Sequence, residues 1–269
     1  MSMLNKVLSF FRHNRRNMKS AANNGLKIQN RAGQLNQYGK YGKYGQYEQY
    51  KPYEQIETDF KNMNKDRKLR KIKEVFANIP RFETDRLILR RIKESDYIDI
   101  YEYSSDLEVT KYLTWYPHAN LKESKDYASY LQKRYDSGKF FDWGLVYKPD
   151  GKFVGTCGFT SINLNKNSCE VGYVLSKKYW GMGIIPEALD CVMEFAFDYF
   201  GFERVEARYL DGNAKSKRVM QKAGMILEKI DYNILHVKGE YKTVYTYYIT
   251  KEMFEYRKRN RINAGINNI

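Results

Sequence analysis

Residues 179–189 read YWGMGIIPEAL, and two glycines stand one residue apart where a strand-like apolar run changes to a helix-like one. Because glycine has no side chain, Gly181 and Gly183 allow a ligand to approach the backbone closely. A helix that begins just after them directs free N–H groups and the positive end of its dipole at the turn. The residues alone leave two interpretations open: a plain turn, or a seat for a phosphate.

A second polar feature follows the predicted strand at 204–209, where Asn213 and Ser216 precede a short helix. In one interpretation Asn213 is simply an N-cap, with Ser216 in the first helical turn. In the other, both side chains lie at the carboxyl end of a strand, where open sheets bind ligands. The glycine run lacks the third glycine and acid of a dinucleotide fingerprint, and it lacks the Gly-Lys-Ser/Thr of a P-loop.

The predicted elements after residue 81 mix short strands with helices. Strands are predicted at 86–92, 141–147, 153–162, 169–175, 204–209, 225–230 and 244–250. Helices are predicted at 95–103, 109–115, 121–135, 185–199 and 214–223. An antiparallel meander that passes into a strand–helix–strand unit indicates an α+β fold, with mixed α/β layers.

The motifs, in this order, closely resemble the GNAT acetyltransferase superfamily. They are Glu170-Val171-Gly172-Tyr173-Val174-Leu175, Tyr179-Trp180-Gly181-Met182-Gly183-Ile184, Glu187-Ala188-Leu189, Asn213-x-x-Ser216 and Lys222-Ala223-Gly224-Met225. The likeness is greatest to the RimJ/RimL branch of ribosomal-protein N-terminal acetyltransferases, whose first strand is similar to residues 83–90. It covers about residues 81–252. The resemblance implies the acyl-CoA N-acyltransferase fold: a central, mostly antiparallel sheet with a V-shaped splay, flanked by helices.

The resemblance also implies acetyl-CoA as co-substrate, with no metal. In the family the pyrophosphate lies against the backbone of the loop at 178–183, where Lys178 replaces the usual Gln or Arg. Backbone groups near Val174, Leu175 and Ser176 would hold the pantetheine and polarise the thioester carbonyl. The implied cofactor-binding residues are Val174, Leu175, Ser176, Lys178, Trp180, Gly181, Met182, Gly183, Ile184, Asn213 and Ser216.

Two residues are the candidates for proton transfer when an amine attacks the thioester. Glu170 is in the family's position for a carboxylate base, acting directly or through water, and the alternative is a structural strand carboxylate facing polar neighbours. Ser216 is the candidate acid, and the alternative is a helix-start serine. Met220 stands where many members have a tyrosine acid, which excludes that acid here. Glu187 would repel a phosphate, so it is interpreted as structural.

The sequence specifies the residues that bind the acceptor amine less clearly than those that bind the donor. Four aromatic residues could line an acceptor groove or belong to the core: Trp115, Tyr116, Trp143 and Tyr173. Three functions follow. The first is acetylation of a protein or peptide N-terminal α-amine, the second is acetylation of a small amine such as an antibiotic or polyamine, and the third is acyl-CoA binding without turnover.

The charge is concentrated in the first part of the chain. The formal net charge is +15, and residues 1–80 carry 17 Lys/Arg against 6 Asp/Glu. This basic extension is predicted to contain an amphipathic helix at 3–19, a low-complexity tract with a tyrosine every third residue at 37–54, and a charged helix at 56–78. The GNAT domain is predicted at 81–252 and a basic tail at 253–269.

The extension suggests a macromolecular partner. A basic arm favours RNA, the ribosome or an anionic surface, and aromatic residues interleaved with cations can stack on bases, while a disordered low-complexity tract is the other interpretation. Three cysteines without zinc-like spacing indicate a reduced compartment, so a cytoplasmic location is expected. The sequence has no apolar run of the roughly 18 residues that a membrane span needs.

Overall fold

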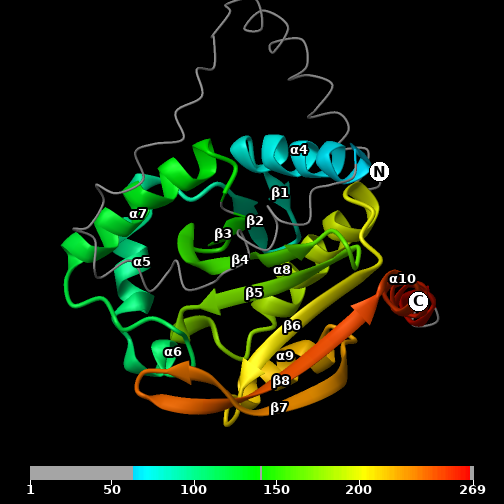
Figure 1. The fold of residues 1–269 in the computed structure, drawn as a ribbon. Coiled ribbons are helices and arrows are strands. Elements are labelled where there is room, and N and C mark those ends of the chain that lie inside the picture. The colour runs from blue at the N-terminus through cyan, green and yellow to red at the C-terminus, as the bar shows by residue number, and fades with distance from the viewer. Residues whose placement is uncertain (1–62, 140, 267–269) are drawn as a thin grey trace, which may run out of the picture. The chain divides into compact units, whose positions relative to one another are not determined.

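One eight-stranded sheet organises the computed structural model, which describes residues 63–139 and 141–266 (Figure 1). The strands lie in the order β1-β2-β3-β4-β5-β6-β8-β7. Neighbouring strands are antiparallel, except that β5 and β6 are parallel. The bounds are β1 Phe82–Glu83, β2 Leu87–Arg90, β3 Asp142–Tyr147, β4 Lys152–Asn163, β5 Ser168–Leu175, β6 Arg204–Leu210, β7 Ile226–Val237 and β8 Glu240–Thr250. This is the mixed, mostly antiparallel sheet that the sequence predicted.

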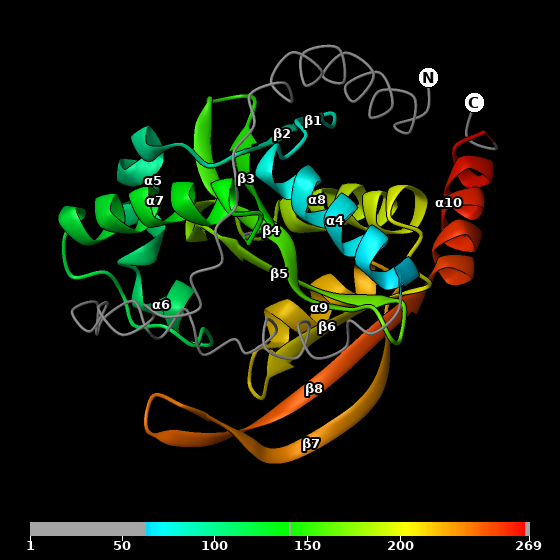
Figure 2. The ribbon, with the colours of Figure 1, turned by 45° about the horizontal axis from the view of Figure 1, so that its top comes forward.

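Helices cover both faces of the sheet (Figure 2). They are α4 Met63–Ala77, α5 Tyr97–Ser104, α6 Leu107–Thr110, α7 Leu121–Asp136, α8 Ile184–Glu194, α9 Ala214–Lys222 and α10 Lys251–Ile266. Consecutive residues of a strand point to opposite faces, and Trp143 packs on Phe195 next to the end of α8. The adjacent Gly144 faces Phe153, whose ring stacks on Tyr103 of α5. Thus α8 and α5 lie on opposite faces.

Helix α8 is amphipathic, as its sequence pattern predicted. Ala188, Leu189 and Val192 are fully buried against the sheet. The predicted helix at 185–199 is continuous with α8, but its last turn, Phe195–Tyr199, is a turn of π-helix. The Phe200 N–H donates to the Phe195 carbonyl at 3.3 Å. This wider turn places Phe195 and Phe200 together in the aromatic core, with their ring centroids 4.9 Å apart.

Two helices beyond the predicted domain limits pack into the core. Helix α4 buries Ile72, Val75 and Phe76, and the Phe76 ring lies 4.6 Å from that of Phe141 and 5.4 Å from that of Trp143. Helix α10, in the predicted tail, buries Phe254 against Phe197. The domain limits at residues 80 and 252 therefore stay a prediction. The helices just outside these limits, α4 and α10, pack against the core of the domain. The helix predicted at 3–19 and the tyrosine tract at 37–54 lie outside the described residues.

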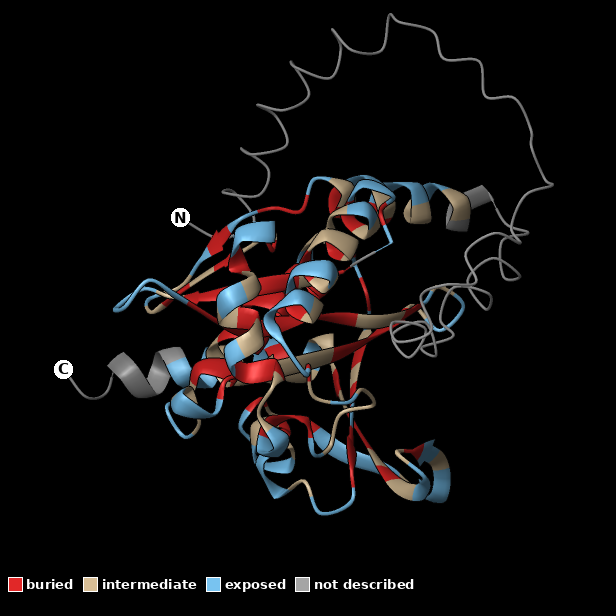
Figure 3. Ribbon diagram, turned by 90° about the vertical axis from the view of Figure 1, so that its left-hand side faces the viewer, coloured by how far each residue is buried: buried red, intermediate tan, exposed pale blue. Residues whose placement is uncertain are grey.

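The β7–β8 hairpin is longer than predicted. The sequence predicted strands at 225–230 and 244–250. In the structure β7 continues to Val237 through a register shift between Asp231 and Leu235, and Asn233 adopts a positive φ of 52°. The hairpin extends from the sheet (Figure 2), and most of β7 is exposed (Figure 3).

The cysteines and the helices agree with two simple expectations from the sequence. Cys157, Cys169 and Cys191 are free and buried, and burial raises the pKa of each thiol, so these cysteines are packing residues. Among the described helices, none is both long and apolar enough to cross a membrane.

Candidate active site

The sheet opens between β5 and β6. Their parallel pairing joins Ser168–Val171 to Arg204–Ala207 and stops there, although β5 continues to Leu175 and β6 to Leu210. On its other side β5 stays paired with β4 as far as Leu175. The two strands thus splay apart beyond Val171, as the V-shaped fold predicts. Backbone groups of β5 that face the splay have no β6 partner and can bind a ligand.

The double glycine forms the turn between β5 and α8. Gly181 has a φ of 81° and Gly183 a φ of 76°, values that side-chain-bearing residues rarely adopt. A Cβ atom added at Gly181 would have no atom within 4 Å, so the backbone is open on this side. Helix α8 begins directly afterwards at Ile184, with Gly183 as its N-cap. Open backbone and a helix N-terminus together make an anion site, which fits the pyrophosphate of acetyl-CoA.

Glu187, in the first turn of α8, connects the glycine turn to the residues that precede β2. It accepts hydrogen bonds from the Arg86 backbone N–H at 3.0 Å, from Arg86 Nε at 2.7 Å and from Thr84 Oγ1. Arg86 Nη1 in turn donates to the Met182 carbonyl at 2.7 Å. Burial acts to raise the pKa of Glu187, but the Thr84 and Arg86 hydrogen bonds outweigh it and lower that pKa. Glu187 is therefore an ionised structural residue, as interpreted from the sequence.

The cations near the loop differ from the prediction in one respect. Lys178, expected to face phosphate, forms an ion pair with Glu102 of α5, and its side chain is largely exposed. Lys215 of α9, which the sequence did not single out, lies with Nζ 3.5 Å from the centroid of the Trp180 ring. Trp180 Nε1 also donates to the Leu175 carbonyl at 2.9 Å, which fixes the ring beside the loop. Lys215, which is distant in sequence, thus places a positive charge beside Trp180 of the loop.

The backbone groups predicted to hold the thioester are partly engaged. The Ser176 N–H donates to the Val154 carbonyl at 2.8 Å, and the Leu175 carbonyl is taken by Trp180. Val174 and Leu175 lie in the part of β5 beyond the end of its pairing with β6. The predicted role of Val174 and Leu175 stays a prediction, while the Ser176 N–H already has a partner within the fold.

Asn213 and Ser216 are joined to β5 by a tyrosine. Asn213 Oδ1 accepts from the Ser216 N–H at 3.1 Å, so Asn213 is the N-cap of α9. Ser216 Oγ forms a 2.8 Å hydrogen bond with the Tyr173 hydroxyl. Burial raises the pKa of Tyr173, so this hydroxyl keeps its proton. Met220 is buried in the core. The hydroxyl pair connects β5 to α9 beside the splay.

Glu170 lies on β5 just before the splay, on the face opposite α8. Arg208 Nη2 lies 2.8 Å from Glu170 Oε2, and Thr160 Oγ1 donates to Oε1 at 3.1 Å. Burial raises the pKa of Glu170, with Arg208 and Thr160 acting in the opposite direction. Both interpretations made from the sequence fit these contacts: a strand carboxylate with polar neighbours, and a carboxylate able to take a proton.

The four aromatic residues that were predicted to line an acceptor groove or to belong to the core lie in different parts of the structure. Trp143 is fully buried and donates from Nε1 to the Pro80 carbonyl at 2.8 Å, so it belongs to the core. Tyr173 faces Ser216, as described above. Trp115 and Tyr116 lie between α6 and α7, where Lys238 of the β7–β8 turn lies over the Tyr116 ring at 5.5 Å. The described residues contain no group of three or more His, Cys, Asp or Glu side chains that could hold a metal.

Comparison with known proteins identifies this arrangement. The family model described as an acetyltransferase (GNAT) domain matches residues 86–226. An N-acetyltransferase of unknown role from Bacillus licheniformis, p20, is 26% identical over 171 residues, 64% of this chain and 96% of its own. The [ribosomal protein uS5]-alanine N-acetyltransferase of Escherichia coli is 25% identical over 177 residues, 62% of this chain and 89% of its own.

Solved structures support the same fold. The ribosomal L7/L12 α-N-protein acetyltransferase RimL, determined in complex with coenzyme A, superposes with a TM-score of 0.55 at 18% identity, over 64% of this chain and 98% of its own. The glycine turn and the splay of β5 from β6 are the features of the present chain that fit such a ligand. Since the family model spans more than half of the chain, the protein belongs to the GNAT acetyltransferases, and it is an N-acetyltransferase that uses acetyl-CoA as its acetyl donor.

Proposed function

We propose that the acceptor is the N-terminal α-amine of a protein or peptide. The E. coli relative is named for acetylating the alanine of a ribosomal protein, and the basic first 80 residues favour a macromolecular partner. The choice of a protein acceptor is supported by this relative and by the basic extension, and acetylation of an amine as such is supported by Glu170 and the Ser216–Tyr173 pair beside the β5–β6 splay. A base candidate and an acid candidate thus lie close to where the thioester would lie.

Binding of the donor is assigned to the backbone. Gly181 and Gly183 expose N–H groups at the start of α8 to the pyrophosphate, and Asn213 is proposed to bind the pantetheine arm. The Leu175 N–H points away from β4, because the next N–H, that of Ser176, bonds to Val154 of β4. This Leu175 N–H is proposed to polarise the thioester carbonyl and to stabilise the negative charge that develops on its oxygen. Acetyl-CoA supplies the activated acetyl group.

Proton transfer is assigned to side chains. Glu170 removes the amine's proton directly or through water, and the amine nitrogen then bonds to the thioester carbon. As the C–S bond breaks, Ser216 donates its hydroxyl proton to the leaving sulfur and regains a proton from water, while Glu170 releases the amine's proton to solvent. The Tyr173 hydroxyl, which stays protonated, can donate to Ser216 Oγ and orient the serine proton outward.

The test is an acceptor screen that follows release of the free thiol of CoA. A library of N-terminal peptides is compared with polyamines, aminoglycosides and the same peptides with blocked α-amines. Turnover that requires a free α-amine supports the proposal, and turnover only on small amines replaces it with small-molecule acetylation. Contact with RNA or the ribosome, and a cytoplasmic location, stay predictions to be tested separately.

A further inference from the structure

Asp142, the first residue of β3, lies on the same face of the sheet as Glu170. In the strand register Asp142 is opposite Gly158, and Gly158 is opposite Gly172. Asp142 Oδ1 is only 2.3 Å from the position that a Gly158 Cβ would take, so the carboxylate lies over this glycine. Residues directly opposite each other in a sheet share a face. Asp142 therefore lies on the face that Glu170 shares with Thr160, which covers Gly172.

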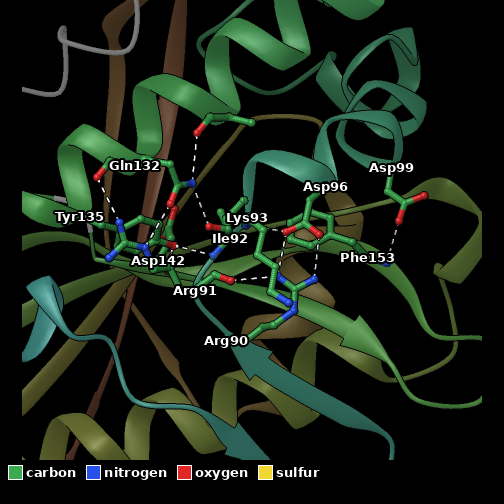
Figure 4. Close-up of polar contacts among 11 residues, drawn as sticks. Arg90, Arg91, Ile92, Lys93, Asp96, Asp99, Gln132, Tyr135, Asp142 and Phe153 are labelled. Atoms are coloured by element: carbon green, nitrogen blue, oxygen red, sulfur yellow. Dashed lines mark hydrogen bonds and ion pairs between the residues drawn. The ribbon is translucent and has the colours of Figure 1, made fainter.

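The Asp142 carboxylate has no hydrogen-bond or ion-pair partner among the described residues. Its backbone carbonyl accepts a hydrogen bond from the Tyr135 hydroxyl at 2.6 Å. The nearby guanidinium groups are engaged elsewhere. Arg90 binds both oxygens of Asp96, and Arg91 binds Gln132 (Figure 4). Arg91 also forms an ion pair with Asp136. An anion in such a position lacks the compensation that buried carboxylates normally have.

Asp142 is partly buried, and the two guanidinium groups near it are already paired with other side chains. Burial raises the pKa of Asp142 to about 7. The titratable groups that sense its charge are Tyr103 of α5, Tyr135 of α7 and Cys157 of β4, and burial raises the pKa of all three, so they stay neutral. A cation that reached Asp142 would favour the charged form of this carboxylate and would form an ion pair with it.

Asp142 and Glu170 are too far apart to bind the same ammonium group. Strand β4 lies between β3 and β5, so two strand spacings, about 10 Å, separate the two strands. Glu170 also lies two residues along β5 from Gly172, the residue across from Asp142, so the two backbones are about 12 Å apart. An extended peptide advances about 3.4 Å per residue, and a long side chain adds to this reach. If the reacting amine lies at Glu170, the group at Asp142 therefore belongs to a long side chain of the second or third residue.

We propose that Asp142 binds a second positive charge of the acceptor. The ligand is an ammonium or guanidinium group on the second or third residue of a peptide, or the distal ammonium of a diamine. This inference rests on the proposed acetylation of an amine at Glu170, and it adds a specificity determinant that is separate from the proton-transfer residues.

The test compares peptides that differ only by lysine or glutamine at positions two and three. We expect the wild-type protein to prefer the lysine peptides by about tenfold in kcat/KM, mainly through KM, as for a close charge pair. Asp142→Asn should remove the preference and leave kcat on the glutamine peptides unchanged. Asp126→Asn, at an exposed site on α7, is the matched control and should keep the preference. A diamine compared with a monoamine of equal length shows whether small acceptors are recognised in the same way.

Lower pH should weaken the preference. Because the carboxyl group titrates near pH 7, the lysine preference should be larger at pH 8 than at pH 6. Peptides acetylated with no lysine preference, or a preference that survives in Asp142→Asn, would overturn the inference while leaving the proposed function intact. If no peptide or diamine is acetylated, the proposed function fails and this inference fails with it.

A stability measurement tests the unpaired carboxylate without any turnover. The native pKa lies above the usual value for aspartate, so charging Asp142 costs stability at pH values above 7 and costs nothing below the ordinary range. Asp142→Asn should therefore raise Tm relative to wild type at pH 8 and leave it unchanged at pH 4, while Asp126→Asn changes neither. An unchanged Tm at pH 8 would show that the carboxylate is compensated and would overturn the inference.

Discussion

The turn proposed to bind the donor and the surface proposed to face the acceptor are built in different ways. The turn consists of residues 176–187, contiguous in sequence, and presents mainly backbone groups held by the Arg86–Glu187 contacts. The acceptor-facing surface draws Asp142, Thr160, Glu170 and Arg208 from four strands, and presents side chains. Backbone recognition depends on conformation, whereas side-chain recognition depends on which residue occupies each strand position. The donor can therefore be inferred from a local motif, while the acceptor requires the assembled sheet.

The largest expected effect comes from breaking the donor side alone. Gly183→Glu introduces a side chain at a positive φ and a negative charge at the pyrophosphate, and should weaken CoA binding by about a thousandfold. Calorimetric titration with CoA measures it. Gly201→Glu is the control, because Gly201 also has a positive φ, 64°, and open space around it, but lies beyond the opposite end of α8. Equal CoA affinity in wild type and Gly183→Glu would contradict the assignment of the turn.

The next effect should fall on the acceptor side alone. Glu170→Gln keeps the shape of the side chain but cannot take a proton, so kcat should drop by about a hundredfold. The affinity for CoA should not change. Steady-state kinetics with the best peptide from the screen measures kcat, with Glu228→Gln, a carboxylate paired with Arg204 on the sheet, as control. A normal kcat in Glu170→Gln would leave only the structural interpretation of this residue.

A smaller effect is expected where the two sides meet. Tyr173→Phe removes the hydrogen bond to Ser216 Oγ, and the loss of one such bond corresponds to about tenfold in kcat. Ser216→Ala should reduce kcat at least as far. Tyr256→Phe, an exposed tyrosine on α10, serves as control. If Tyr173→Phe were fully active while Ser216→Ala was impaired, Ser216 would act without its tyrosine partner.

The smallest effect should come from loosening the donor side by a substitution outside the turn itself. Arg86→Gln removes the guanidinium contacts to Glu187 and to the Met182 carbonyl, and partly exposed ion pairs are worth up to about 1 kcal/mol, or about fivefold in CoA affinity. Arg81→Gln, which loses only an exposed pair with Glu83, is the control. A loss as large as that of Gly183→Glu would mean that Arg86 itself contacts the phosphate.

Much of the fold could be predicted because its signals are local. The apolar period of α8, the glycine turn and the N-cap Asn213 each depend on neighbours within a few residues. The prediction of β7 stopped short because turn-forming residues at 231–233 are carried through as an irregular strand by pairing with β8. The packing of α4 could not be predicted either, since Phe76 contacts rings more than sixty residues away.

From the sequence alone, the donor followed from the resemblance to the GNAT family, which rests on motifs that include Gly181, Gly183, Asn213 and Ser216. These residues set a backbone turn and two helix caps, which are short-range properties. Only the tertiary structure decided how side chains from separate strands combine. It paired Tyr173 with Ser216, Arg208 with Glu170 and Lys215 with Trp180. It also left Asp142 without a partner over Gly158. The physical reason is that charge compensation and desolvation depend on distances across the sheet, and these distances are set by strand order and register.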